Sequence, residues 1–175
     1  MRDLAVVGLV VVAAIALGTF LFFFGSSSIR SQVYEALGSN TNSTNTVRIT
    51  VLAQGTNAVS ITTRTNYRIQ NAHDLDSLWS LVYGANDTPA TPVVDFSKNE
   101  VLAIFDGNDP TPGYTISVVS ITDESSNRLV LVNHATPPTT CQTKNTTTRP
   151  FEIIEVLKTT LAISHQDQMG IAPCP

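Results

Sequence analysis

Three histidines and two groups of carboxylates are the side chains whose types and spacing could support chemistry. His73, His134 and His165 lie far apart along the chain, and none belongs to a His-x-His or His-Glu-x-x-His pair. Three surface or loop histidines are the plain interpretation, although these residues and several aspartates can still converge in space. A hydrolytic enzyme of an unfamiliar type therefore stays open as a second hypothesis, and no catalytic or metal-ligating residue is assigned.

Both groups of carboxylates fall where the chain is expected to turn. The segment Asp106-Gly-Asn-Asp109-Pro carries oxygen ligands of the kind that calcium prefers, but it lacks the other ligands and the closing glutamate of an EF-hand loop. Asp123 and Glu124 are adjacent acids in a hairpin turn. Because Asp, Asn, Gly and Pro favour turns, both segments are interpreted as turns. No P-loop or Gly-x-Ser-x-Gly motif occurs, and no cofactor is predicted.

The two cysteines, Cys141 and Cys174, lie in proline-rich surroundings in the C-terminal part of the chain. An even number of cysteines in an exported domain favours a disulfide, and the absence of Cys-x-x-Cys argues against a redox motif or a zinc ribbon. The bond would close a ring of about 34 residues, which chain-entropy models value at roughly 3–4 kcal/mol. We predict this disulfide; two free thiols are the alternative.

A long polar loop, rich in Thr and Pro, runs from Ala135 to Arg149. Loops of more than about 12–15 residues are often functional or disordered. We expect this loop, together with the turn that begins at Asp106, to contact a protein partner. Seven residues are candidates for that contact: Asp106, Asn108, Asp109, Tyr114, Thr139, Lys144 and Arg149.

These side chains must be positioned by strands and one helix. Period-two alternation predicts about six short strands. They lie at 47–52, 59–62, 100–105, 114–121, 128–133 and 151–157, with a weaker one at 161–163. Strands joined by short turns predict a β-rich α+β fold, a mostly antiparallel sheet that carries one packed helix.

The helix follows the second predicted strand. Asp74 is a plausible N-cap, and Gly84 can take the left-handed position at the C-terminal end. The apolar residues recur with helical spacing and predict one buried face. They are Leu75, Leu78, Trp79 and Val82.

The start of the chain differs from the rest. Leu4 to Phe24 holds 21 residues without a charge, and a helix of this length spans about 30 Å, the thickness of a bilayer's hydrocarbon core. We expect an uncleaved transmembrane signal-anchor at 1–24, with signal cleavage and secretion as the alternative. We expect residues 25–46 to form a stalk, because this segment is rich in Ser, Thr and Asn. We expect residues 47–175 to form an extracytoplasmic domain.

The formal net charge is −4, which argues against nucleic acid as a partner. The charge signal for membrane orientation is nearly balanced, because Arg2 and Arg30 flank the apolar run and Asp3 offsets one of them. The predicted disulfide favours a domain outside the cytoplasm.

Several segments in order resemble the PrcB C-terminal domain family, the accessory subunit of an exported bacterial protease complex. Val94-Asp-Phe96 precedes the strand ending at Phe105, and Gly107, Pro110-Thr111 and Gly113-Tyr114 follow. Pro137-Pro138, Cys141 and Arg149-Pro-Phe-Glu-Ile-Ile-Glu-Val156 complete the likeness. The resemblance implies a non-catalytic, stabilising role. Members of the family are typically exported or lipid-anchored, whereas this chain has no lipobox.

The leading hypothesis is therefore a single-pass protein of the bacterial cytoplasmic membrane whose outer domain binds an envelope protein, such as an exported protease. A pilin-like surface subunit is a further alternative. It is disfavoured because the apolar run has neither a Gly-Phe cleavage site nor an acidic residue just inside it.

Overall fold

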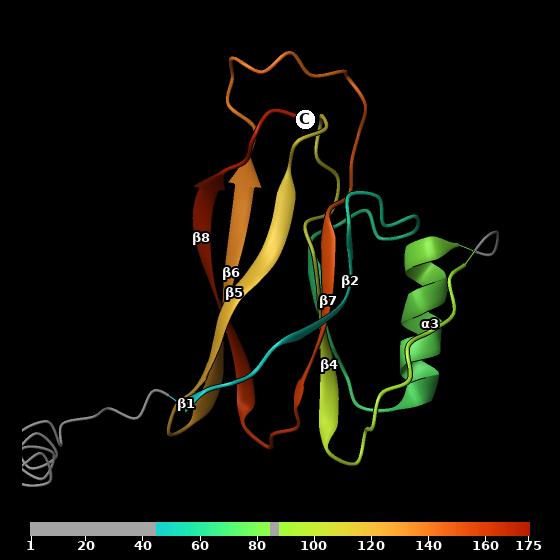
Figure 1. Ribbon diagram of the computed structural model, residues 1–175, viewed down its shortest axis with the longest axis vertical. Coiled ribbons are helices and arrows are strands. Elements are labelled where there is room, and N and C mark those ends of the chain that lie inside the picture. Colours follow the sequence, from blue (N-terminus) through green and yellow to red (C-terminus); the bar gives the residue numbers. More distant parts are fainter. Residues whose placement is uncertain (1–44, 85–87) are drawn as a thin grey trace, which may run out of the picture. The chain divides into compact units, whose positions relative to one another are not determined.

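The computed structural model describes residues 45–84 and 88–175. Within these residues, eight strands form two four-stranded sheets and one helix packs on the second sheet (Figure 1). The elements are β1 (Asn45–Thr46), β2 (Thr50–Gly55), β3 (Thr65–Ile69), α3 (Ala72–Tyr83), β4 (Asn99–Phe105), β5 (Thr115–Asp123), β6 (Asn127–Thr136), β7 (Phe151–Leu157) and β8 (Ala162–Ile171). The first sheet has the order β1-β5-β6-β8 and the second β2-β7-β4-β3.

Strand β4 lies at the centre of the packing, and its side chains are buried on both faces. Val101, Ala103 and Phe105 belong to the core between the second sheet and α3. Leu102 and Ile104 belong to the core between the two sheets. A strand covered on both faces appears in the sequence as a continuous apolar run, and this explains the run Val-Leu-Ala-Ile-Phe.

Helix α3 covers the outer face of the second sheet. All four apolar residues predicted for its buried face are buried: Leu75, Leu78, Trp79 and Val82. The N-cap is Asn71 rather than Asp74, because the Asn71 side chain accepts a hydrogen bond from the Asp74 backbone N–H at 2.9 Å. Gly84 ends the helix with φ +78° and ψ −173°, a positive φ that glycine adopts at no steric cost.

The predicted single sheet of about six strands is wrong in two respects: the described residues form eight strands, and these divide between two sheets. The weak strand predicted at 161–163 is the ten-residue strand β8, which pairs in parallel with β6. Residues 59–62 form no strand. The backbone N–H groups of Val59 and Ser60 instead donate to the carbonyls of Val82 and Leu81 at the end of α3, groups that the helix cannot satisfy internally.

The predicted anchor at 1–24 and most of the predicted stalk lie outside the described residues. Asn45 and Thr46 pair with Thr122 and Asp123 of β5, so strand pairing starts two residues before the predicted boundary at 47. None of the helices described in 45–84 and 88–175 is long and apolar enough to cross a membrane.

The two ends of the stacked sheets differ in what they carry. Strands β2, β4, β6 and β8 all finish at one end, and the segments 56–64, 106–114, 137–150 and 172–175 gather there (Figure 1). We call this the loop end. Strand β1 pairs with the last residues of β5, so the chain enters the folded domain at the opposite end.

Candidate functional site: the loop end

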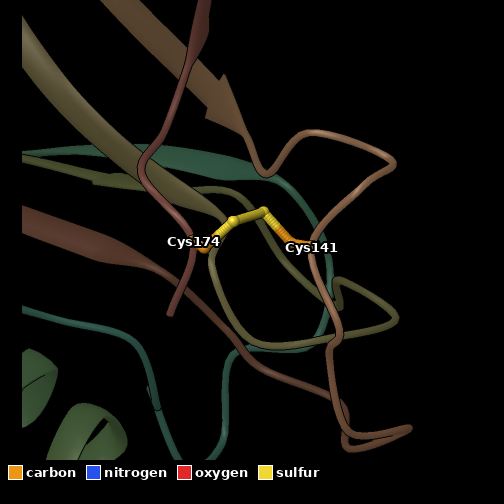
Figure 2. The surroundings of a disulfide bond; sticks show 2 residues. All are labelled: Cys141 and Cys174. Carbon is orange, nitrogen blue, oxygen red and sulfur yellow. A yellow bond between two sulfur atoms is a disulfide. The ribbon is translucent and has the colours of Figure 1, made fainter.

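A disulfide joins Cys141 to Cys174, with the two Cα atoms 5.4 Å apart (Figure 2). The bond was predicted from the sequence and is confirmed. It ties the segment after β8 to the long loop between β6 and β7. The backbone adds a second tie, because the Ala172 N–H donates to the Thr136 carbonyl at 2.9 Å. The C-terminal segment is thus held against the loop end.

The turn after β4 is fastened to the end of the long loop. Asp109 and Thr148 exchange backbone hydrogen bonds of 2.8 and 2.9 Å. The Arg149 Nε donates to the Asn108 Oδ1 at 2.7 Å. Gly107 has φ +85°, and a Cβ at this position would lie 2.7 Å from the Arg64 backbone nitrogen. The turn interpretation of this segment agrees with this geometry.

All seven residues predicted to contact a partner lie at the loop end, in the turn from 106 to 114 and in the loop from 137 to 150. Thr139 and Lys144 are exposed, whereas Arg149 is half-buried and bonded to the neighbouring turn. Tyr114 lines a hollow of about 290 Å³ together with Pro112, Pro173 and other residues at the loop end. The structure brings the seven together; contact with a partner stays a prediction.

His134 lies at this end of the sheets, on the buried face of β6, with an exposed fraction of 6%. Its Nδ1 is 3.0 and 3.1 Å from the two carboxylate oxygens of Asp106. Its Nε2 is 2.6 Å from the Arg64 Nη2 and 3.3 Å from the Asp167 Oδ1. Arg64 and Asp167 also form an ion pair of 2.7 Å. The expectation of a surface or loop histidine is wrong here, because β6 directs this side chain between the sheets.

The contacts of His134 define what it can do. A guanidinium can only donate hydrogen bonds, so Nε2 accepts the bond from Arg64 and Nδ1 carries the proton that it donates to Asp106. A histidine that acts as a general base needs an unoccupied nitrogen directed at the group it deprotonates. Here both ring nitrogens are engaged, Nδ1 with Asp106 and Nε2 with Arg64. The arrangement therefore links the two sheets through polar contacts.

The other two histidines do not join this group. His73 is exposed on α3, and His165 lies on β8, where it is paired in register with Val130. Burial lowers the pKa of His165, with Asp167 acting in the opposite direction. Within the part of the chain that the structure describes, no three His, Cys, Asp or Glu residues are arranged to hold a metal ion.

Asp109 has an unusual environment for a carboxylate in a turn. Its Oδ2 is buried and has no hydrogen-bond partner. Burial, with the nearby charge of Asp106 as the second cause, raises the pKa of Asp109 to about 6, and His134 opposes the rise. A carboxyl group in this position titrates close to the physiological range rather than near pH 4.

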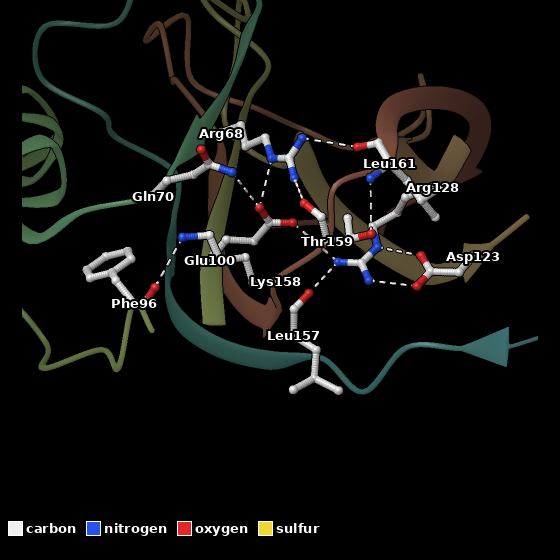
Figure 3. A network of polar contacts seen from close by, with 10 residues as sticks. All are labelled: Arg68, Gln70, Phe96, Glu100, Asp123, Arg128, Leu157, Lys158, Thr159 and Leu161. Carbon is white, nitrogen blue, oxygen red and sulfur yellow. Dashed lines mark hydrogen bonds and ion pairs between the residues drawn. The ribbon is translucent and has the colours of Figure 1, made fainter. Parts of the chain in front are cut away.

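A second polar network crosses the sheets at the opposite end (Figure 3). Glu100 of β4 is fully buried and accepts hydrogen bonds from three side chains. The donors are Arg68 Nε at 2.8 Å, Gln70 Nε2 at 3.1 Å and Arg128 Nη1 at 3.3 Å. Arg68 and Gln70 come from the end of β3 and Arg128 comes from β6, so Glu100 joins β3, β4 and β6.

Arg128 is 2% exposed, and the N–H groups of its guanidinium donate hydrogen bonds to residues of both sheets. Its Nε and Nη2 reach the two oxygens of Asp123 at 2.6 and 2.8 Å. Its Nη1 also donates to the Leu157 carbonyl at 2.5 Å. The carboxylate of Asp123, proposed above only as a turn residue, thus has a structural partner, and this ion pair lowers the pKa of Asp123.

The sequence did not single out either network. The bonded pairs of the two networks lie between 5 and 103 positions apart in the sequence, and most of them meet only because of the register of the sheets. One signal was present in the apolar strands: Glu100, Arg128 and His134 interrupt or border buried runs, and a charged group in such a place requires a partner.

The fold and the loop end together define a disulfide-bonded, β-rich domain in which a helix and two sheets form three layers. Residues 101–156, about a third of the chain, match the model of the PrcB C-terminal family. The match runs from β4 to β7 and confirms the resemblance seen in the sequence. No curated protein and no solved structure matches the chain.

Proposed function

We propose that this chain is a membrane-anchored accessory subunit of an exported protease complex, and that its loop end is the surface that binds the partner. The family match carries this proposal. The matched residues 101–156 include both the turn from 106 to 114 and the loop from 137 to 150. The family likeness and the candidate contact surface therefore fall on the same part of the chain.

The architecture of the loop end suits a binding role. The disulfide fastens the loop from 137 to 150 to the segment after β8, and the Asp109–Thr148 backbone bonds fasten the same loop to the turn from 106 to 114. A surface ordered in this way loses less conformational entropy on binding than free loops would. Thr139 and Lys144 stay exposed on it.

A stabilising role without catalysis agrees with the engagement of His134. Asp106 and His134 form the pair that most resembles a catalytic arrangement. The Nε2 of His134, which faces away from Asp106, is bonded to Arg64. A catalytic role would require Arg64 to move away and expose Nε2. The hypothesis of a hydrolytic enzyme is therefore the weaker of the two.

Purification of the tagged full chain from detergent-solubilised membranes of its host tests the proposal. We expect an exported protease to copurify and to be identified by mass spectrometry. The double variant Thr139→Arg/Lys144→Glu should lose most of it, because both substitutions alter exposed side chains of the loop end. Lys98→Glu is the matched control, since Lys98 is exposed near the opposite end and forms a surface ion pair with Asp95.

Three outcomes would contradict the proposal. They are recovery of no protease, equal recovery with the loop-end variant, and equal loss with Lys98→Glu. Melting temperatures of the variants should match that of the wild type, because exposed substitutions away from special features usually change stability by less than about 0.5 kcal/mol.

The proposed location is the bacterial cytoplasmic membrane, with residues 1–24 as a single anchor and the domain outside the cytoplasm. The apolar run and the confirmed disulfide support this placement. Protease added to intact spheroplasts should degrade the domain. Full protection of the domain would reverse the orientation, and a mature chain lacking the first residues would favour cleavage.

A further inference from the structure

Strand β8 forms one edge of the first sheet (Figure 1). Its ten residues pair with β6 along their whole length and without a bulge. Among the described strands, none pairs with its other side. An exposed edge offers a row of backbone donors and acceptors to any strand that can approach it.

The other three sheet edges are shorter, and one of them is irregular, whereas β8 has ten residues without a bulge. Strand β1 has two residues, β3 has five, and β2 carries a register shift between Val51 and Ala53. Short edges and bulges are the usual protections. Strand β8 contains no Lys or Pro, and it ends in the strongly exposed Met169 and Ile171, at 75% and 82%.

The direction of the backbone groups along β8 follows from one hydrogen bond. The Ala172 N–H donates to the Thr136 carbonyl of β6. Because successive residues of a strand direct their backbone groups to opposite sides, the even-numbered residues of β8 face β6. The backbone groups of Ile163, His165, Asp167 and Met169 therefore face outward.

We propose that a second copy of this chain pairs with this edge, β8 against β8 and antiparallel, with the twofold axis at Gln166. In this register His165 lies opposite Asp167 of the second copy, and Ile163 lies opposite its Met169. A polar imidazole thus faces a carboxylate and two apolar residues face each other, and the backbone groups of all four residues face the open edge. The pairing is self-complementary, as a twofold interface requires.

Neighbouring registers fit less well. An axis at Asp167 sets two carboxylates opposite each other, which is destabilising, and an axis at His165 sets Ile163 against an aspartate. The paired stretch ends at Ile163, because the Leu161 carbonyl already accepts a hydrogen bond from Arg68. The dimer joins two four-stranded sheets into one continuous sheet, and it leaves each loop end free. The inference goes beyond the proposed function and does not depend on it.

Cysteine cross-linking of the full chain in detergent tests the register. In the proposed pair, Gln166 faces Gln166 of the second copy as a non-hydrogen-bonded pair, with Cα atoms about 4.5 Å apart, within reach of a disulfide. Gln168 is displaced from its own copy by four residues, roughly 13 Å. Oxidised Gln166→Cys should therefore give about ten-fold more covalent dimer than Gln168→Cys, its matched control on the same exposed face.

A measurement of the protein mass in the micelle completes the test. The wild type should have twice the chain mass of 18.8 kDa. Met169→Lys should give single chains with an unchanged melting temperature, because a lysine on an edge opposes strand addition. The proposal is overturned by a single-chain wild type, by equal cross-linking of the two cysteine variants, by a Met169→Lys dimer, or by cross-linking of Gln166→Cys to a different host protein.

Discussion

Asp109 shows how a single residue of the loop end responds to pH. Its pKa is raised to about 6 from an ordinary value of 3.8, so the folded chain holds this proton more tightly than the unfolded chain. The contribution of Asp109 to the free energy of unfolding is therefore most favourable below pH 4. It falls as the pH rises from 4 to 6 and is constant above that range.

The variant Asp109→Asn removes the ionisable group and keeps its shape. We expect it to be more stable than the wild type by about 1 kcal/mol at pH 8, after allowance for solvent screening, and equally stable below pH 4. Thermal unfolding at several pH values measures this difference. Asp95→Asn, at an exposed position where hydrogen bonds from Ser97 lower the pKa, should show no gain at pH 8. A pH-independent effect of Asp109→Asn would contradict the assignment.

Glu100 is the residue on which the second polar network depends. Glu100→Gln removes the charge that faces Arg68 and the buried Arg128. Loss of one partner of a buried ion pair typically costs about 3–5 kcal/mol, and we expect a loss of that size in urea unfolding. Glu124→Gln, in the exposed turn after β5, should change stability by less than about 0.5 kcal/mol. Equal effects of the two variants would show that the network contributes little.

At the scale of elements, the turn after β4 depends on a close approach between segments. Gly107 and Gly84 both have positive φ, but a Cβ at Gly107 would meet the backbone of residues 62–64 at 2.7–3.1 Å. At Gly84 the nearest atoms belong to the Val59 side chain, at 3.7 Å and beyond. Space is therefore available at only one of the two positions.

We expect Gly107→Ala to destabilise the domain clearly more than Gly84→Ala. The latter carries only the strain of a backbone conformation that is essentially restricted to glycine, on the order of 1–3 kcal/mol, whereas the former must also displace backbone. Urea unfolding of both variants measures the difference. A Gly107→Ala variant as stable as Gly84→Ala would mean that the turn moves away from residues 62–64 without cost.

The disulfide links two other elements, the β6–β7 loop and the segment after β8. We expect Cys141→Ser/Cys174→Ser to lose about 3 kcal/mol of unfolding free energy, because the unfolded chain regains the freedom of the ring. Wild-type protein in reductant should behave like the double variant and serves as its control. An unchanged urea midpoint in both would show that the backbone contacts alone hold the C-terminal segment.

At the scale of the whole molecule, strands β4 and β7 contribute to both cores. Phe105 and Ile153 pack toward α3, whereas Ile104 and Ile154 pack toward the first sheet. Because β4 and β7 belong to both cores, unfolding of one core removes these two strands from the other core as well.

We therefore expect one cooperative transition for residues 44–175. Trp79 fluorescence reports on the core at α3, and far-ultraviolet circular dichroism reports on both sheets. The two probes should give coincident urea curves in the oxidised wild type. Separate midpoints would indicate that the helix layer unfolds independently.

The sequence alone determined the helix, the four central strands, the turns and the disulfide. The helix rests on local information, the spacing of the apolar residues on its buried face. The disulfide rests on a count, because each of the two cysteines has only the other as a partner within the chain. The family likeness also came from the order of short segments. The tertiary structure decided the rest: the division into two sheets, the parallel pairing of β8, and the meeting of Arg64, Asp106, His134 and Asp167. These depend on strand register, and strand register is set by packing between residues far apart in the chain.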